Sequence, residues 1–126
     1  DHGKGGRNQQ TVLAAAEHVL SMGDWPPGLL IASIGTDGED GPTDAAGGLV
    51  DANVVEAFLN ENVASESDAG SREGGAPVPQ ARLTEQLISA RLRCDAYPLL
   101  DRSRGLVRTG PSGTNVADLR ILLARP

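Results

Sequence analysis

An apolar run from Leu29 to Ile34, bounded by Gly28 and Gly35, constrains the fold more than any other feature of the sequence. A short apolar run without alternation is typical of a strand that is covered on both faces. Before it, apolar residues recur at helical spacing from about Gln10 to Met22, where Gly23 ends the pattern. Helices that alternate with buried strands predict an α/β domain.

The rest of the chain continues this alternation with weaker signals. A helix is expected from about Leu83 to Arg93, with a break at Pro98. Residues Asn60–Ala81 have no periodicity and are rich in Ser, Glu, Gly and Pro, so we expect a long mobile surface loop. The remaining expected elements are a short helix at Asn53–Leu59 and strands at Gly105–Thr109 and Leu119–Leu123.

Composition limits the class of protein. The length of 126 residues fits one domain, and with only 2% aromatic residues the core must consist of Leu, Val, Ile and Ala. A net charge of −6 argues against nucleic acid or a membrane surface as the partner. The single Cys94 cannot form an internal disulfide, which favours the cytoplasm and a packed apolar role. His2 and His18 lack the neighbours of a zinc site.

The first of three loops rich in glycine and polar residues spans residues 3–9, before the first expected helix. Gly5 and Gly6 would let backbone amides approach an anion, which a helix N-terminus attracts. Arg7 can form a bidentate pair with a carboxylate or a phosphate. The alternative is a flexible lead-in with a solvent-facing arginine. The string is neither a P-loop nor a dinucleotide fingerprint.

The second loop, Gly35–Asp44, carries Asp37, Asp40 and Asp44 directly after the buried strand. Such carboxylates can hold Mg²⁺, accept a proton from a hydroxyl, or bind a polyol. The loop lacks the terminal glutamate of an EF-hand, which argues against calcium. The alternative is that these residues form turns and that Asp44 caps the next segment of the chain.

The third loop, residues 109–115, offers hydroxyl groups from Ser112 and Thr114, an amide from Asn115, and exposed backbone amides. These groups suit phosphate or carboxylate oxygens, although the same residues also make ordinary turns. Just after the loop, Asp118 and Arg120 are expected to pair on the surface.

Strings in these loops, taken in order, resemble the MOFRL domain of bacterial-type glycerate kinases, some of which are labelled hydroxypyruvate reductases. Gln10 stands where that family usually has Glu, and Asp95-Ala96-Tyr97 looks like an altered form of its Asn-Asp-Ser-Tyr element. The other matching strings are Gly5-Gly6-Arg7-Asn8-Gln9, Gly35-Thr36-Asp37-Gly38, Gly41-Pro42-Thr43-Asp44-Ala45-Ala46-Gly47, Thr109-Gly110-Pro111-Ser112-Gly113-Thr114-Asn115-Val116 and Asp118-Leu119.

The resemblance implies that residues 1–126 form one MOFRL domain, a three-layer α/β/α sandwich on a mixed sheet, which follows a larger Rossmann-like domain. It implies ATP- and Mg²⁺-dependent phosphorylation of D-glycerate at its 2-hydroxyl, in a cleft between the domains. Because the family's essential lysine belongs to the N-terminal domain, we expect no turnover from this chain alone. Catalytic roles are expected for Arg7, Asp37 and Asp44; substrate or phosphate binding for Gly5, Gly6, Asn8, Thr36, Gly38, Ser112, Gly113, Thr114 and Asn115; and metal binding for Asp37 and Asp40.

Two other functions stay open at this point. A hydroxypyruvate reductase would need a Gly-x-Gly-x-x-Gly turn after a strand, and the sequence has none. A non-catalytic ligand-binding or interaction module would bind glycerate or nucleotide without turnover. The sequence does not determine the oligomeric state and leaves a homo-oligomer open.

Overall fold

Four helices and four strands make up the described part of the chain, residues 3–68 and 79–125 of a computed structural model. Their order is α1 (Arg7–Ser21), β1 (Leu29–Gly35), β2 (Gly47–Val50), α2 (Ala52–Asp68), α3 (Pro79–Leu92), α4 (Ala96–Arg102), β3 (Leu106–Val107) and β4 (Asp118–Ala124). No helix in these ranges is both long and apolar enough to cross a membrane.

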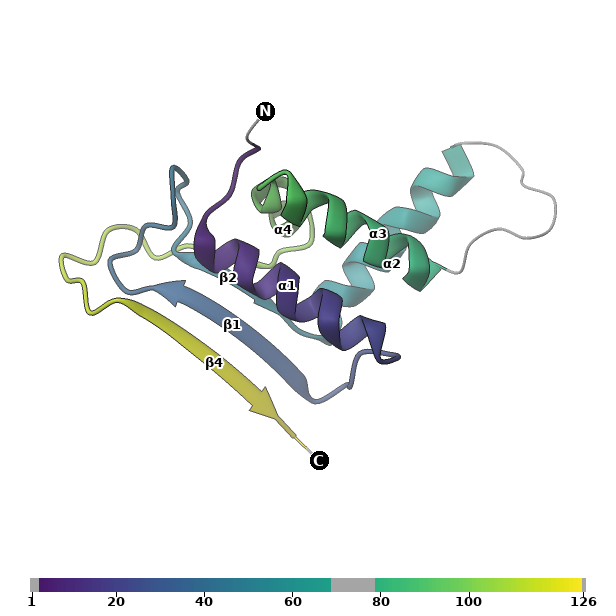
Figure 1. Ribbon diagram of the computed structural model, residues 1–126, viewed down its shortest axis with the longest axis horizontal. Helices are drawn as coiled ribbons and strands as arrows, with labels where there is room; N and C mark the ends of the chain where they lie inside the picture. Colours follow the sequence, from purple (N-terminus) through teal and green to yellow (C-terminus); the bar gives the residue numbers. More distant parts are fainter. Residues whose placement is uncertain (1–2, 69–78, 126) are drawn as a thin grey trace.

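The strands form one antiparallel sheet in the order β3-β2-β1-β4. The central strand β1 pairs with β4 along its full length, from Leu29 opposite Ala124 to Gly35 opposite Asp118. On its other side, β1 pairs with the shorter β2, from Ile31 opposite Val50 to Ile34 opposite Gly47. The helices lie on one side of this sheet, and α1 packs across β1 and β2 (Figure 1).

The core lies between the helices and one face of the sheet. Leu29 and Ile31 of β1 pack against it from the sheet side. Aliphatic residues dominate, as the composition predicted, but the buried Phe58 and Trp25 also contribute. The other buried members are Val12, Leu13, Ala16, Leu20, Val50, Val54, Val55, Leu83, Leu87, Ala90, Ala96, Leu99 and Leu100.

This architecture confirms an α/β domain but differs from the expected sandwich. All three strand pairings among the described residues are antiparallel, so the expected mixed sheet is not what they form. The chain reverses between β1 and β2 through a loop without a helix, which places the two strands antiparallel. Helices cover one face of β1 rather than both (Figure 1).

Several element boundaries also differ from the sequence prediction. Helices occupy both ends of the range Asn60–Ala81 that was expected to be a loop, because α2 continues to Asp68 and α3 begins at Pro79. Residues 60–68 contain alanine and glutamate, which favour helix, and no glycine or proline. The rest of that expected loop, residues 69–78, lies outside the described residues.

Two short elements escaped the sequence prediction. Pro98 does not break the chain, because it occupies the third position of α4, where the backbone amide would have no partner within the helix. The strand β2 begins with Gly47 and Gly48, which have no β propensity and acquire their partners only through pairing with β1.

Candidate functional site

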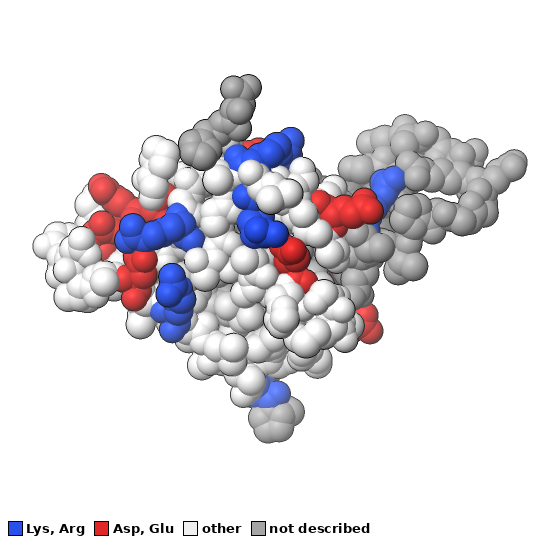
Figure 2. Space-filling view, in the orientation of Figure 1, with Lys and Arg blue, Asp and Glu red and all other residues white. Residues whose placement is uncertain are grey.

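The three loops singled out in the sequence meet at the end of the sheet where β1 ends and β4 begins. The backbone N–H of Thr36 donates to the carbonyl of Ala117 at 3.1 Å, and that of Ser112 donates to the carbonyl of Asp37 at 3.1 Å. Figure 2 shows acidic and basic side chains gathered side by side at this end of the molecule, at the left of the view. The structure therefore brings together segments that lie far apart in the sequence.

Arg7, the first residue of α1, forms a bidentate ion pair with Asp118, the first residue of β4. Its Nε donates to Oδ2 at 2.6 Å and its Nη2 to Oδ1 at 3.0 Å. The arginine side chain is 75% exposed, whereas the aspartate is only 17% exposed. The Arg7 hydrogen bond, helped by Asn8, lowers the pKa of Asp118 to about 2. We expected Asp118 to pair with Arg120, but Arg7 is its partner and Arg120 contributes only charge at longer range.

Asp40 caps the N-terminus of α1 from the second loop. Its Oδ1 accepts the backbone N–H of Asn8 at 2.9 Å, and its Oδ2 accepts that of Gln9 at 2.9 Å. The side chain is 1% exposed. A carboxylate at this position satisfies two of the unpaired amides at the helix end and complements its positive dipole. The anion that the sequence predicted at this helix end is thus provided, for these two amides, by the protein itself.

Asn8 connects this cap to the sheet. Its side-chain amide nitrogen donates to Oδ1 of Asp40 at 3.2 Å and to Oδ1 of Asp118 at 3.3 Å. Its side-chain oxygen accepts the hydroxyl of Ser33 at 2.6 Å. Ser33 is fully buried and was absent from the expected site, although a single hydroxyl within the apolar run of β1 was the signal that could have revealed it.

The glycines of the first two loops fill tight places against the protein. A Cβ on Gly6 would collide with Asp40, and one on Gly5 would lie 3.1 Å from the backbone nitrogen of Ala96. Gly38 has a φ of +85°, and a Cβ there would collide with the carbonyl oxygen of Gly110 in the third loop. Close packing against neighbouring parts of the chain accounts for these glycines without a ligand.

Asp44 belongs to a second network, formed with residues from α4 and the segment after β3. Its Oδ1 accepts the hydroxyl of Tyr97 at 2.7 Å, and its Oδ2 accepts Nε of Arg108 at 3.2 Å. Arg108 also donates to Tyr97 at 3.0 Å and to Asp101 at 3.0 Å. The Tyr97 hydrogen bond is the largest cause of a lowered pKa of Asp44 and of a raised pKa of Arg108.

The sequence predicted only part of this second network. Tyr97 was part of the family resemblance, but Arg108 and Asp101 carried no signal because their role depends on the fold alone. Lys4 of the first loop completes the network, with its Nζ 3.9 Å from the centre of the Tyr97 ring. At this distance a cation and an aromatic ring attract each other.

The remaining predicted residues hydrogen-bond within their own loops or to a neighbouring loop. Asp37 is half-buried, and its Oδ1 accepts the backbone N–H of Glu39 at 3.0 Å. Ser112 donates its hydroxyl to the carbonyl of Thr36 at 2.5 Å, and Asn115 accepts the backbone N–H of Ala117 at 3.0 Å. Among the described residues, no three His, Cys, Asp or Glu side chains are arranged to hold a metal ion. The roles in substrate and metal binding stay predictions.

A cavity of about 640 Å³ opens beside Arg7. It is bordered by Gly5, Gly6, Gly41, Pro42 and Cys94, together with Gly3 and Gln10. Both polar atoms of the Gln10 side-chain amide are buried and lack a hydrogen-bond partner within the described part of the chain. The cavity therefore borders an unsatisfied polar group as well as the exposed guanidinium.

Comparison with known proteins identifies the family. The family model described as "MOFRL family" matches residues 1–71, more than half of the chain. The chain belongs to the MOFRL family. It is 38% identical over 120 residues to D-glycerate 2-kinase of Thermotoga maritima, covering 95% of this chain and 22% of that protein. It is 34% identical over 121 residues to glycerate 2-kinase of Pyrococcus horikoshii, covering 96% and 21%.

A solved structure supports the same relationship. The crystal structure of glycerate kinase from Thermotoga maritima matches with a TM-score of 0.67 and 35% identity, over 98% of this chain and 24% of that chain. The MOFRL chain thus spans about a fifth of the length of the curated relatives it matches.

The charges of this MOFRL site are fixed at neutral pH. Carboxylates and guanidinium groups are ionised at neutral pH at their ordinary pKa values, and the contacts here favour the charged forms further: the pKa values of Asp118 and Asp44 are lowered and that of Arg7 is raised. Two of the three guanidinium nitrogens of Arg7 hold Asp118, while Nη1 has no partner among the described residues. The arrangement can therefore present an oriented cation to an anionic ligand.

Proposed function

We propose that this chain is the C-terminal domain of a glycerate kinase and contributes to ATP-dependent phosphorylation of D-glycerate at its 2-hydroxyl. The observation that carries the proposal is the similarity, over almost the whole chain, to proteins named glycerate kinase in both sequence and structure. The hydroxypyruvate reductase alternative has no supporting feature, because the loop after β1 lacks the Gly-x-Gly-x-x-Gly spacing of a dinucleotide turn.

Arg7 is the proposed catalytic residue on this domain. Phosphoryl transfer spreads negative charge over the transferred group, and a positioned guanidinium stabilises that charge. The bidentate contact with Asp118 fixes the plane of the guanidinium, so Nη1 can face an anion in the cavity beside it. Asp118 is then a positioning residue that acts through Arg7.

Asp37 is the carboxylate that fits a role at Mg²⁺, because it is half-buried and, among the described residues, only its Oδ1 accepts a hydrogen bond. Asp40 fits less well, since both its oxygens hold backbone amides of α1. Mg²⁺ in phosphotransferases is commonly bound by one or two carboxylates together with substrate phosphates, and it offsets their negative charge. A dedicated cage of protein ligands is therefore not required here.

Asp44 suits holding a hydroxyl better than accepting its proton. An efficient general base has a pKa near the operating pH, whereas Tyr97 and Arg108 lower the pKa of Asp44. We propose that Asp44 orients D-glycerate by hydrogen bonding, and that Thr36, Gly38 and residues 112–115 of the third loop bind further oxygens of the substrate. A Rossmann-like domain of the same enzyme would supply the essential lysine and nucleotide contacts.

The test compares two arginines that each form a bidentate ion pair with a carboxylate. In the full-length enzyme, we expect Arg7→Lys to reduce kcat strongly, because lysine keeps the charge but loses the planar fork. Arg91→Lys is the matched control. Arg91, on α3, donates to the carboxylate of Glu17 through Nε at 2.8 Å and through Nη2 at 3.4 Å. Steady-state kinetics and thermal melts are measured for both variants. Near-normal turnover of Arg7→Lys with an unchanged melt would contradict the proposal.

A further inference from the structure

The last strand, β4, carries exposed leucines on both of its faces. Antiparallel partners point to the same side of a sheet, so Leu122, opposite Ile31, lies on the side that faces the helices. Leu119, opposite Ile34, and Leu123, opposite Leu30, lie on the other side. Their exposed fractions are 50% for Leu119, 65% for Leu122 and 58% for Leu123. Around these three leucines, neither face of β4 is covered by the described residues.

β4 is also an edge strand in the observed strand order. Soluble proteins protect their sheet edges with lysine, proline, bulges or very short strands, because a free edge pairs with other chains. β4 is seven residues long, pairs with β1 without interruption, and has Arg120 as its single cation. Its sequence is that of an interior strand, with apolar residues on both faces.

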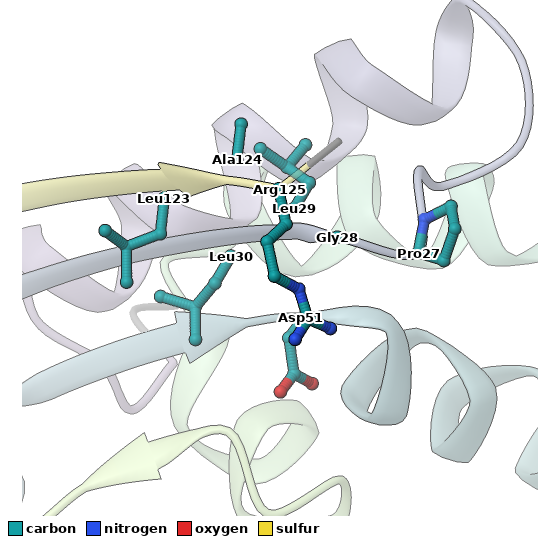
Figure 3. A pocket seen from close by; sticks show the side chains of 8 residues that line it. All are labelled: Pro27, Gly28, Leu29, Leu30, Asp51, Leu123, Ala124 and Arg125. Carbon is teal, nitrogen blue, oxygen red and sulfur yellow. The ribbon is translucent and has the colours of Figure 1, made fainter.

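The surface around β4 is suited to apolar contact. Figure 2 shows mostly uncharged surface along this part of the molecule, between the charged cluster near the start of β4 and the cation near its end. A hollow of about 420 Å³ lies at the end of the strand, bordered by residues of β1 and β4. Figure 3 shows the side chains of Leu30 and Leu123 at this hollow pointing to the same side of the sheet.

We propose that β4 is an interior strand of the complete protein, paired along its free edge with a strand from another part of the same polypeptide. Apolar side chains of that part cover Leu119, Leu122 and Leu123. The length of the relatives indicates what pairs with β4. This chain spans about a fifth of their length, so most of a polypeptide of that length is available to cover the surface around β4. The inference rests on the proposed function only in taking the chain as part of a protein of that length.

Hydrogen–deuterium exchange of the full-length enzyme tests the pairing directly. In an edge strand, alternate backbone amides point away from the neighbouring strand and exchange rapidly, whereas an interior strand has both sets of amides hydrogen-bonded. We expect slow exchange at consecutive amides from Leu119 to Leu123. Fast exchange at every second amide would overturn the proposal. Protection that disappears on dilution, together with dissociation measured by light scattering, would assign the edge to a second copy instead.

A pair of variants tests the apolar cover. Leu123→Asp is expected to lower the melting temperature of the full-length enzyme by about 5–10 °C, because it places a charge in a buried contact. Leu92→Asp is the control, since Leu92 ends α3 and is 71% exposed. Equal small shifts in both variants would show that Leu123 stays exposed and would contradict the proposal. Kinase activity is assayed separately, because a protected β4 in an inactive protein would reject the function but not the pairing.

Discussion

Removal of the Asp40 carboxylate is expected to destabilise the chain more than any other single change in the three loops. Asp40 is buried and accepts the backbone amides of Asn8 and Gln9, both at 2.9 Å, as well as the side-chain amide of Asn8 at 3.2 Å. Alanine at this position leaves these donors buried near the end of α1 without an acceptor. The first turn of the helix, which carries Arg7, then loses its cap.

The magnitude follows from the number of bonds lost. A hydrogen bond to a charged group contributes about 1.5–3 kcal/mol, and loss of a helix cap costs about 0.5–2 kcal/mol. With two backbone amides deprived of their acceptor, Asp40→Ala should lower the free energy of unfolding by about 3–5 kcal/mol. For a domain of this length, about 4 °C of melting temperature corresponds to 1 kcal/mol, so the expected shift is about 12–20 °C.

Circular dichroism melts and urea unfolding of the chain measure this effect. Asp37→Ala is the matched control, because Asp37 lies in the same loop, is half-buried, and accepts one backbone amide from the described part of the chain, that of Glu39. Its loss should cost less than about 1 kcal/mol. If Asp40→Ala melts within a few degrees of Asp37→Ala, the capping role derived from the structure is wrong.

Three further predictions concern a glycine contact, an ion pair and the activity of the isolated chain. Gly38→Ala should destabilise the chain more than Gly113→Ala. Both positions have a positive φ, of +85° and +77°, but only a Cβ on Gly38 would collide with another loop. Equal melting temperatures of the two variants would refute that contact. The pKa of Asp118 falls from its ordinary 3.8 to about 2 on folding, so its stabilising effect is present above about pH 4 and is lost as the pH falls towards 2. Asp118→Asn should therefore flatten the loss of melting temperature over that interval, and an unchanged slope would contradict the ion pair. Finally, this chain alone should show no glycerate-dependent ADP formation in a coupled assay, whereas turnover on the usual enzymatic scale of about 1–1000 per second would contradict the need for a second domain.

Helix α1 and strand β1 could be predicted from the sequence because their information is local. The apolar residues of α1 recur at the helical period, and β1 is an apolar run between glycines, so each pattern determines the element before any tertiary contact forms. β2 and α4 could not be predicted in this way. The strand begins with two glycines and depends on pairing with β1, and the helix accommodates Pro98 only because of its position in the first turn.

The sequence also located the site at the level of segments. The order of the glycine- and aspartate-containing strings identified the MOFRL family, and the structure brings the three loops together. Which residue contacts which could not be read from the strings. Arg7 and Asp118 are 111 positions apart, and Asp44 and Tyr97 are 53 apart, so no local pattern connects them.

The tertiary structure alone decided the role of each carboxylate. The sequence presents Asp37, Asp40 and Asp44 as three similar residues of one loop, because an aspartate's chemistry is the same wherever it occurs in the chain. In the fold, Asp37 makes a local turn, Asp40 is buried at the end of α1, and Asp44 lies in the network of Tyr97 and Arg108. Burial and the nearest donors determine whether a carboxylate caps a helix, orients a cation or stays available to a ligand, and both depend on distances that only the folded chain sets.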